Sequence, residues 1–494
     1  MQTLLSVWSF IVNNILTQPA YFIGIIVALG YILLRKPWYE VLAGFIKASV
    51  GYFILIVGSG GLVANFRPIL VGLKDKFQLT ATVIDPYFGQ NAVTAGLQDV
   101  FGRSFGQVMF LMLIAFIFNI LLVKFQKYTK LRALFTTGHV QVQQSATAFW
   151  LFLFCFPQLG NTPILLIMGL ILGLYWSVGS NLTIAPTQEL TDGAGFCVAH
   201  QQMFAIRFFS IIAEKMHKRD EAKGKGPSKK LEDIELPGFL SIFNENIVAT
   251  TILMLLFFGA ILAVLGKPYL VEQGFLKAAD SFFFYVMKTS MYFAVYLAIL
   301  QLGVRTFVSE LTNSFQGISE KLLPGAVPGV DCAVVYGFGS PNAVTIGFLA
   351  GALGQFLAIF ALIILHSPVL IVAGFVPVFF DNATIAVFAN NKGGLKATII
   401  LPFISGLMQV FGSALIAGWV GMAAYGGYLG MWDWAVVWPI FTVIMKYLSY
   451  AGVVLVAVVL IALPQIEYRK NKETYFLCTE DYEKYKEMRS KGIR

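Results

Sequence analysis

The stretch Asn91-Ala92-Val93-Thr94-Ala95-Gly96 occurs a second time, with one change, as Asn342-Ala343-Val344-Thr345-Ile346-Gly347. Each copy follows an apolar run that ends in a glycine break, at Gly58-Ser59-Gly60-Gly61 in the first half and at Gly303 in the second. The shared context favours an internal duplication over a chance match. Because many transporters are built from two such halves in opposite orientations, we predict two inverted repeats.

The composition places these repeats in a membrane protein. Hydrophobic residues make up 57% of the 494 residues and charged residues only 12%, whereas soluble domains carry about 25% charge. A membrane-spanning helix needs about 20 apolar residues, and we predict about 11 such helices. Lipid leaves no partner for an open sheet edge, so the predicted class is an all-α polytopic membrane protein. The apolar runs are 9–34, 41–64, 107–123, 147–178, 247–266, 281–303, 343–371, 398–420 and 436–463.

The charged residues gather in two segments that we expect to be aqueous. Residues 214–235 hold 13 of them and residues 467–494 hold 14. Basic residues also cluster at 35–47 and 124–132, and the positive-inside rule places all four regions in the cytoplasm. The N-terminus is then outside and the C-terminus inside, and the net charge of +9 reflects topology rather than nucleic-acid binding. Three basic residues depart from this pattern: Arg67, Lys74 and Lys76.

These patterns predict how the chain is divided. Polar segments precede both motif copies, at 65–90 and 304–341, and we expect re-entrant or broken helices there, because non-helical backbone at membrane depth must line a cavity. The charged linker is either a solvated loop or a docking patch for a cytoplasmic partner. The predicted units are a transmembrane domain at 1–466, with a first repeat at about 1–212, a linker at 213–237, a second repeat at about 238–430 and a terminal span at 436–463, followed by a charged tail at 467–494.

Two clusters of histidine and glutamine lie within apolar sequence, at 138–144 and 199–202, and they hold two of the four histidines of the chain. On a helix, His139 and Gln143 are one turn apart and share a face. Polar side chains in hydrocarbon must face protein, water or a ligand. The clusters therefore indicate a site for a small polar ligand, although a histidine in a helix can also be a satisfied structural residue.

Further candidates lie near the motif copies. Tyr87 offers a flat face and a hydroxyl, which suit a sugar-like ring, or it is an interfacial anchor. Asp331 follows an apolar stretch, and an acid in such a place is functional by default, unless it pairs with Arg305. Residues 381–384 are a weaker candidate of the same kind, while Glu189 and Asp192 are best explained as caps of the helix that follows them.

No signature of a soluble enzyme accompanies these residues. The four cysteines are scattered without pairing or metal spacing, and no phosphate-binding or dinucleotide-binding loop is present in the sequence. We therefore expect no cofactor, no metal and no nucleic-acid partner, and the catalytic residues remain unknown.

From about residue 5 to 463 the chain resembles the ascorbate-specific membrane component, enzyme IIC, of the bacterial phosphoenolpyruvate-dependent phosphotransferase system. The resemblance implies a homodimer in the bacterial cytoplasmic (inner) membrane, in which a core domain carries the sugar past a dimerisation domain by an elevator-like motion. The residues that carry the resemblance are Leu29-Gly30-Tyr31-Ile32-Leu33-Leu34-Arg35-Lys36, Thr137-Gly138-His139, Pro186-Thr187-Gln188-Glu189, Asp192-Gly193 through His200-Gln201-Gln202, Leu323-Pro324-Gly325-Ala326-Val327, Asp331-Cys332-Ala333 and Asn382-Ala383-Thr384.

The resemblance also implies which residues contact the substrate. The position of Pro86 departs from the family, where a small hydroxyl residue is expected, so a side-chain hydrogen bond would be lost there. The implied contacts are Ser59, Pro86, Tyr87, His139, Gln143, His200, Gln201 and Asp331.

The implied activity is uptake of L-ascorbate coupled to its phosphorylation. A separate cytoplasmic enzyme IIB, which carries a phosphocysteine and depends on enzyme IIA, would convert the sugar to L-ascorbate 6-phosphate, so the donor site lies on that partner. His139, His200 or Asp331 could take the hydroxyl proton. Three alternatives stay open: an ion-coupled transporter of an organic acid, a passive channel, and a phosphotransferase permease for another sugar or pentitol.

Overall fold

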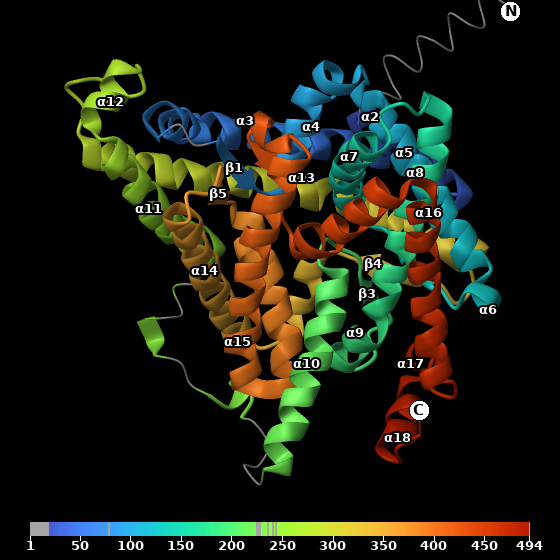
Figure 1. The fold of residues 1–494 in the computed structure, drawn as a ribbon. Helices are drawn as coiled ribbons and strands as arrows, with labels where there is room; N and C mark the ends of the chain where they lie inside the picture. Colours follow the sequence, from blue (N-terminus) through green and yellow to red (C-terminus); the bar gives the residue numbers. More distant parts are fainter. Residues whose placement is uncertain are drawn as a thin grey trace, which may run out of the picture.

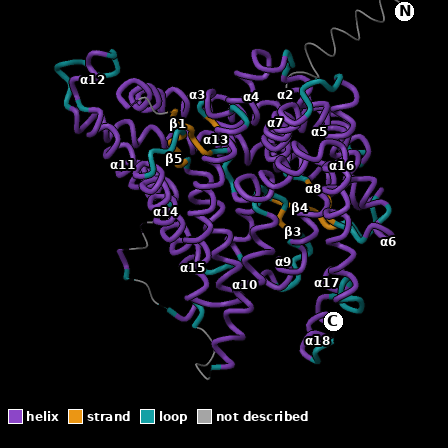
Figure 2. Tube along the Cα trace, in the orientation of Figure 1, coloured by secondary structure: helices purple, strands orange, loops and turns teal. Residues whose placement is uncertain are grey.

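The structure is a computed structural model, and it describes residues 19–77, 80–223, 229–234, 237–239, 242 and 245–493. Long helices dominate these residues, and the strands among them are short (Figure 2). This confirms the predicted all-α polytopic class, while the number of about 11 crossings stays a prediction. Within the described ranges, six helical segments are long and apolar enough to span a membrane: 38–58, 105–124, 161–191, 342–364, 377–419 and 432–470.

The first half of the chain runs from a long helix through three strands to a helix that projects from one end of the molecule (Figure 1). Its elements are α2 (Pro19–Leu33), α3 (Trp38–Phe77), β1 (Thr80–Ile84), α4 (Pro86–Phe101), α5 (Phe105–Lys124), α6 (Gln126–Thr129), β2 (Ala133–Phe135), α7 (Gly138–Cys155), α8 (Asn161–Leu182), α9 (Ile184–Thr191), β3 (Cys197–Val198) and α10 (Met203–Ala222).

The second half repeats the order of a long helix, a strand and a helix that holds the sequence motif. Its elements are η2 (Leu231–Asp233), α11 (Asn246–Leu265), α12 (Lys267–Glu272), α13 (Phe282–Leu322), β4 (Val327–Val330), η4 (Cys332–Gly337), α14 (Pro341–Ile364), β5 (Val369–Ala373), η5 (Pro377–Asp381), α15 (Asn382–Trp419), η6 (Met422–Tyr425), β6 (Gly427–Tyr428), α16 (Trp432–Lys470), α17 (Leu477–Glu480) and α18 (Tyr482–Ser490).

Two parallel three-stranded sheets join the two halves. Their strand orders are β5-β1-β6 and β2-β4-β3. In each sheet the central strand comes from one half and both outer strands come from the other half. In the second sheet, Phe135 lies opposite Gly329 and Val198 lies opposite Val330. This mutual exchange fits a duplicated chain, whose division into repeats stays a prediction.

Each central strand is followed directly by an aspartate that caps the next turn of the chain. Asp85 Oδ1 accepts the backbone N–H of Tyr87, and Asp331 Oδ1 accepts that of Ala333, both at 2.9 Å. The two motif copies lie in the helices that follow, α4 and α14. The repeated sequence therefore marks equivalent positions after equivalent strands.

Part of the charged linker is docked rather than solvated. Leu231 is fully buried beside Cys332 and Val335. The amide of Asn342, the first residue of the second motif copy, donates to the carbonyls of Leu231 and Ile234 at 3.2 and 3.0 Å. Residues 224–228 and 235–236 of the linker lie outside the described ranges.

The charged tail folds back onto the strand β2. Arg132, only 2% exposed, lies directly before this strand. Its guanidinium donates to the carbonyls of Tyr475 and Phe476 at 2.7 and 3.2 Å, and to the hydroxyl of Thr479 at 2.8 Å. The predicted aqueous tail is thus a packed element of the protein.

We expect Arg132→Met to release this tail. A hydrogen bond to a charged group contributes about 1.5–3 kcal/mol, so tryptic cleavage after the basic residues of the tail should become roughly tenfold faster or more. The measurement is limited proteolysis in detergent, followed by mass spectrometry. Arg103→Met is the matched control, because Arg103 also donates to a backbone carbonyl, that of Leu159, outside the tail. Equal cleavage rates in both variants would contradict this role of Arg132.

Candidate functional site

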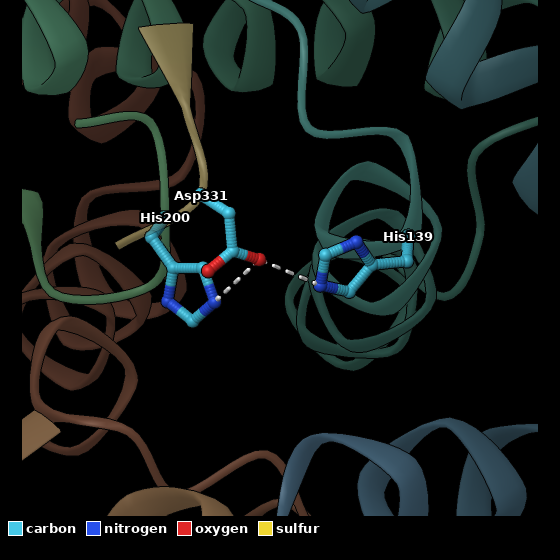
Figure 3. Close-up of side chains that lie close together, drawn as sticks. All are labelled: His139, His200 and Asp331. Atoms are coloured by element: carbon cyan, nitrogen blue, oxygen red, sulfur yellow. Dashed lines mark ion pairs between the residues drawn. The ribbon is translucent and has the colours of Figure 1, made fainter. Parts of the chain in front are cut away.

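Three residues that are distant in sequence meet at one edge of the sheet β2-β4-β3: His139, His200 and Asp331 (Figure 3). Asp331 Oδ2 lies 3.4 Å from Nε2 of His139 and 3.9 Å from Nε2 of His200. Each residue follows one strand of the sheet within four positions. Parallel strands place their carboxyl ends at the same edge, where α/β proteins bind ligands, and this geometry brings the three side chains together.

The two oxygens of the Asp331 carboxylate have different surroundings. Its Oδ1 is held by the backbone N–H of Ala333, while Oδ2 faces the two imidazoles. The Asp331 side chain is 21% exposed, against 7% and 5% for His139 and His200, so the carboxylate is the accessible member of the group. The side chain of Arg305, the alternative partner, lies outside the described residues.

Two glutamines support His200. Its Nδ1 lies 2.7 Å from Oε1 of Gln202, whose amide donates to the carbonyl of Phe380 at 3.4 Å. Gln144 donates to the backbone carbonyl of His200 at 3.2 Å, and its own orientation is set by the indole N–H of Trp176 at 2.6 Å. These contacts make Nδ1 of His200 the N–H nitrogen and direct Nε2 towards Asp331.

A second pair of glutamines extends the site. Gln201 donates to Oε1 of Gln143 at 2.7 Å, and Tyr87 lies close enough to Gln143 for their side chains to interact. Oε1 of Gln201 is buried and has no hydrogen-bond partner among the described residues. An orphaned buried acceptor costs about 1–3 kcal/mol, so this oxygen is suited to a ligand donor.

The other predicted candidates are not among the residues that make the contacts described above. Pro86 is buried as the first residue of α4, next to Tyr87. The side chain of Ser59 lies outside the described residues. Asp381 is fully buried, and its Oδ2 accepts the backbone N–H of Trp432 and the amide of Gln409, so it joins α15 to α16.

The interpretation of Glu189 and Asp192 as caps is wrong. Glu189 pairs with Lys392 and accepts the hydroxyl of Tyr485 in the tail, while Asp192 ends α9 and pairs with Lys486. The start of α10 is held instead by Asp433 of α16, which accepts the backbone N–H groups of residues 204 and 205, both at 3.1 Å. Spacing could not reveal this cap, because it comes from a distant helix.

The other sheet has an equivalent aspartate but a closed edge. Asp85 follows β1 as Asp331 follows β4, yet its Oδ2 faces the backbone N–H of Val376 at 3.4 Å. A side-chain carbon at Gly374 would lie 2.5 Å from Cβ of Asp85, so the neighbouring backbone packs directly on the acid. One of the two equivalent positions is therefore sealed, and the other carries the polar cluster.

The fold and this cluster define a membrane protein with a buried polar site, the class of site that marks a functional position in such proteins. The helices expected to break at residues 58–61 and at Gly303 are instead continuous, as α3 and α13. The chain matches the family described as "PTS system sugar-specific permease component" over residues 14–436, and it belongs to that family. It is thus a multi-pass membrane protein of this family.

A curated relative is also similar to the chain. It is the "Ascorbate-specific PTS system EIIC component" of Mycoplasma pneumoniae (strain ATCC 29342 / M129 / Subtype 1), which is 33% identical over 440 residues. The match covers 81% of this chain and 64% of the relative, so the chain spans just under two thirds of that protein's length.

We expect Asp433→Leu to loosen the segment that carries His200. Loss of a helix cap costs about 0.5–2 kcal/mol, so the amides of residues 204 and 205 should exchange hydrogen roughly tenfold faster. Hydrogen–deuterium exchange with mass spectrometry checks this. In the control Asp481→Ala, which removes a cap on Lys484 in the tail, faster exchange should be confined to the tail. Unchanged exchange at the start of α10 in Asp433→Leu would contradict the assigned cap.

Proposed function

We propose that this permease binds L-ascorbate at the cluster around His139, His200 and Asp331, carries it inward and presents it for phosphorylation. The observation that carries the proposal is the convergence of two imidazoles, a carboxylate and the Gln143–Gln201 pair at one sheet edge. Membership of a sugar permease family and the name of the similar relative support it.

The chemistry of the cluster suits an enediol acid. Ascorbate is an anion at neutral pH with several hydroxyl groups, so it offers both acceptors and donors. The imidazole of His139 and the amide N–H groups of the glutamines can donate to the enediolate oxygens, while Asp331 Oδ2 and Gln201 Oε1 can accept its hydroxyl protons. Tyr87 supplies an aromatic face beside Gln143 for the flat ring.

Transport by this proposal is an elevator-like motion within a homodimer. The sheet β2-β4-β3 ties the site to both halves of the chain, so the site residues would move as one body. The N-terminus lies outside, and the C-terminus lies in the cytoplasm of a bacterium, as the positive-inside rule predicts.

Phosphorylation takes place on the cytoplasmic side. The sugar hydroxyl oxygen attacks the phosphorus of a phosphocysteine on a separate enzyme IIB, which is recharged through enzyme IIA. The oxygen–phosphorus bond forms, the sulfur–phosphorus bond breaks, and the hydroxyl loses its proton. His139, His200 and Asp331 are the groups of the cluster that can take this proton. Cys478, within the tail, is only 3% exposed, and we assign it no part in phosphoryl transfer.

We expect His200→Ala and Asp331→Ala to bind L-ascorbate at least tenfold more weakly than the wild type, because hydrogen bonds to charged groups contribute about 1.5–3 kcal/mol each. Binding of radiolabelled L-ascorbate against a panel of sugars and pentitols measures this. His366→Asn is the control, because His366 is exposed and has a positive φ of 53° that asparagine tolerates. Unchanged affinity in both site variants would remove this site assignment.

We also expect uptake to require enzyme IIB. Liposomes that hold the permease with phosphorylated enzyme IIB should accumulate ascorbate 6-phosphate, and liposomes without it should only equilibrate the sugar. Mass spectrometry of the lumen identifies the product. If an ion gradient instead drives the accumulation of unmodified ascorbate without enzyme IIB, the protein is an ion-coupled transporter.

A further inference from the structure

We infer that His139, His200 and Asp331 also form a three-ligand site for a divalent transition-metal ion, of which Zn²⁺ is the best fit. The inference goes beyond the proposed function, because it assigns the cluster a second class of ligand. It rests on the proposed function in one consequence only: an ion held by these three atoms would exclude the sugar.

The donor atoms and their spacing fit zinc. One ligand atom from each residue lies within 4.8 Å of the others. Zinc binds imidazole nitrogen and carboxylate oxygen at about 2.0–2.2 Å, which places neighbouring ligands of a tetrahedral site roughly 3.3–3.6 Å apart. The His139–Asp331 distance of 3.4 Å already meets this, and the His200–Asp331 distance of 3.9 Å needs a small closure. The two imidazoles, whose ligand atoms lie within 4.8 Å of each other, close on the ion by side-chain rotation.

In two of the three ligands, the polar atom that would not bind the ion is already held by a hydrogen bond. Nδ1 of His200 is held by Gln202, and Oδ1 of Asp331 is held by the N–H of Ala333. Metal-binding histidines almost always donate their second N–H in this way, which fixes the ring and leaves the inner nitrogen as the ligand. His200 and Asp331 thus have the supporting contacts that metal ligands have.

The donor set also selects among ions. Imidazole suits Zn²⁺, Ni²⁺ and Cu²⁺, whereas Mg²⁺ and Ca²⁺ prefer oxygen ligands. Three protein ligands leave the fourth tetrahedral position for a water molecule. Zn²⁺ is also the practical probe, because it has no redox chemistry with a reducing sugar acid.

The first experiment titrates the purified full-length permease with Zn²⁺ alone, by isothermal titration calorimetry in detergent. We expect one strong site per protomer in the wild type and at least a tenfold loss of affinity in His200→Gln and Asp331→Asn. The Asp331→Asn variant keeps an oxygen that can cap Ala333, so the local fold is retained. The remaining histidines provide the control: the double variant His217→Gln/His366→Gln should keep the strong site.

The second experiment tests the supporting contact. Gln202→Leu leaves all three ligands in place, and we expect it to weaken Zn²⁺ binding by about 10–100-fold. Gln141→Leu is the matched control, because Gln141 is a buried glutamine that donates to the carbonyl of Phe135. X-ray absorption of the zinc-loaded wild type should show two imidazoles in the first shell. Equal Zn²⁺ affinity in wild type, His200→Gln and Asp331→Asn would overturn the inference.

Competition separates this inference from the proposed function. If both hold, Zn²⁺ displaces radiolabelled ascorbate from the wild type and, to the same extent, from His217→Gln/His366→Gln, which keeps all three ligands. If Zn²⁺ binds through the three ligands but leaves ascorbate bound, the metal site stands and the sugar lies elsewhere. If ascorbate binding depends on the cluster while Zn²⁺ binding does not, the sugar site stands and the metal site is refuted.

Discussion

Backbone hydrogen bonding inside a bilayer is the constraint on which the rest of this structure depends. Where helices break, the freed N–H and C=O groups must find protein partners. This chain meets the requirement with two short parallel sheets, each made of a central strand from one half and two outer strands from the other. The sheets tie the halves together, and the edge of one of them presents His139, His200 and Asp331 at a single place.

Buried polar side chains follow from the same constraint. Gln144 and Gln202 hold the segment around His200, while Asp433 binds the start of α10 and Asp381 binds that of α16. A buried polar group without a partner is costly, so these contacts fix the positions of the elements that they join. The side chains of the candidate site are therefore supported by a second set of buried polar side chains.

The sequence indicated the residues of the candidate site more clearly than the residues that hold them in place. His139 and Gln143 could be paired from helical spacing, and Asp331 from the rarity of acids in apolar sequence. Gln143 and Gln144 are adjacent and chemically alike, yet one meets Gln201 at the site and the other holds the backbone of His200. The sequence could not predict these different roles of Gln143 and Gln144. It also could not show that Arg132 binds the tail. The reason is the same in both cases, because these contacts join segments that are distant in the sequence.

The sequence by itself determined the membrane class, the duplicated motif and the two histidine–glutamine clusters, because hydrophobicity, repetition and helical spacing are local properties of a chain. Only the tertiary structure decided that three separate segments form one site, that the equivalent edge at Asp85 is sealed, and that the linker and the tail are docked. The physical reason is that strand exchange between the halves sets which segments become neighbours, and the sequence of neither half contains that information alone.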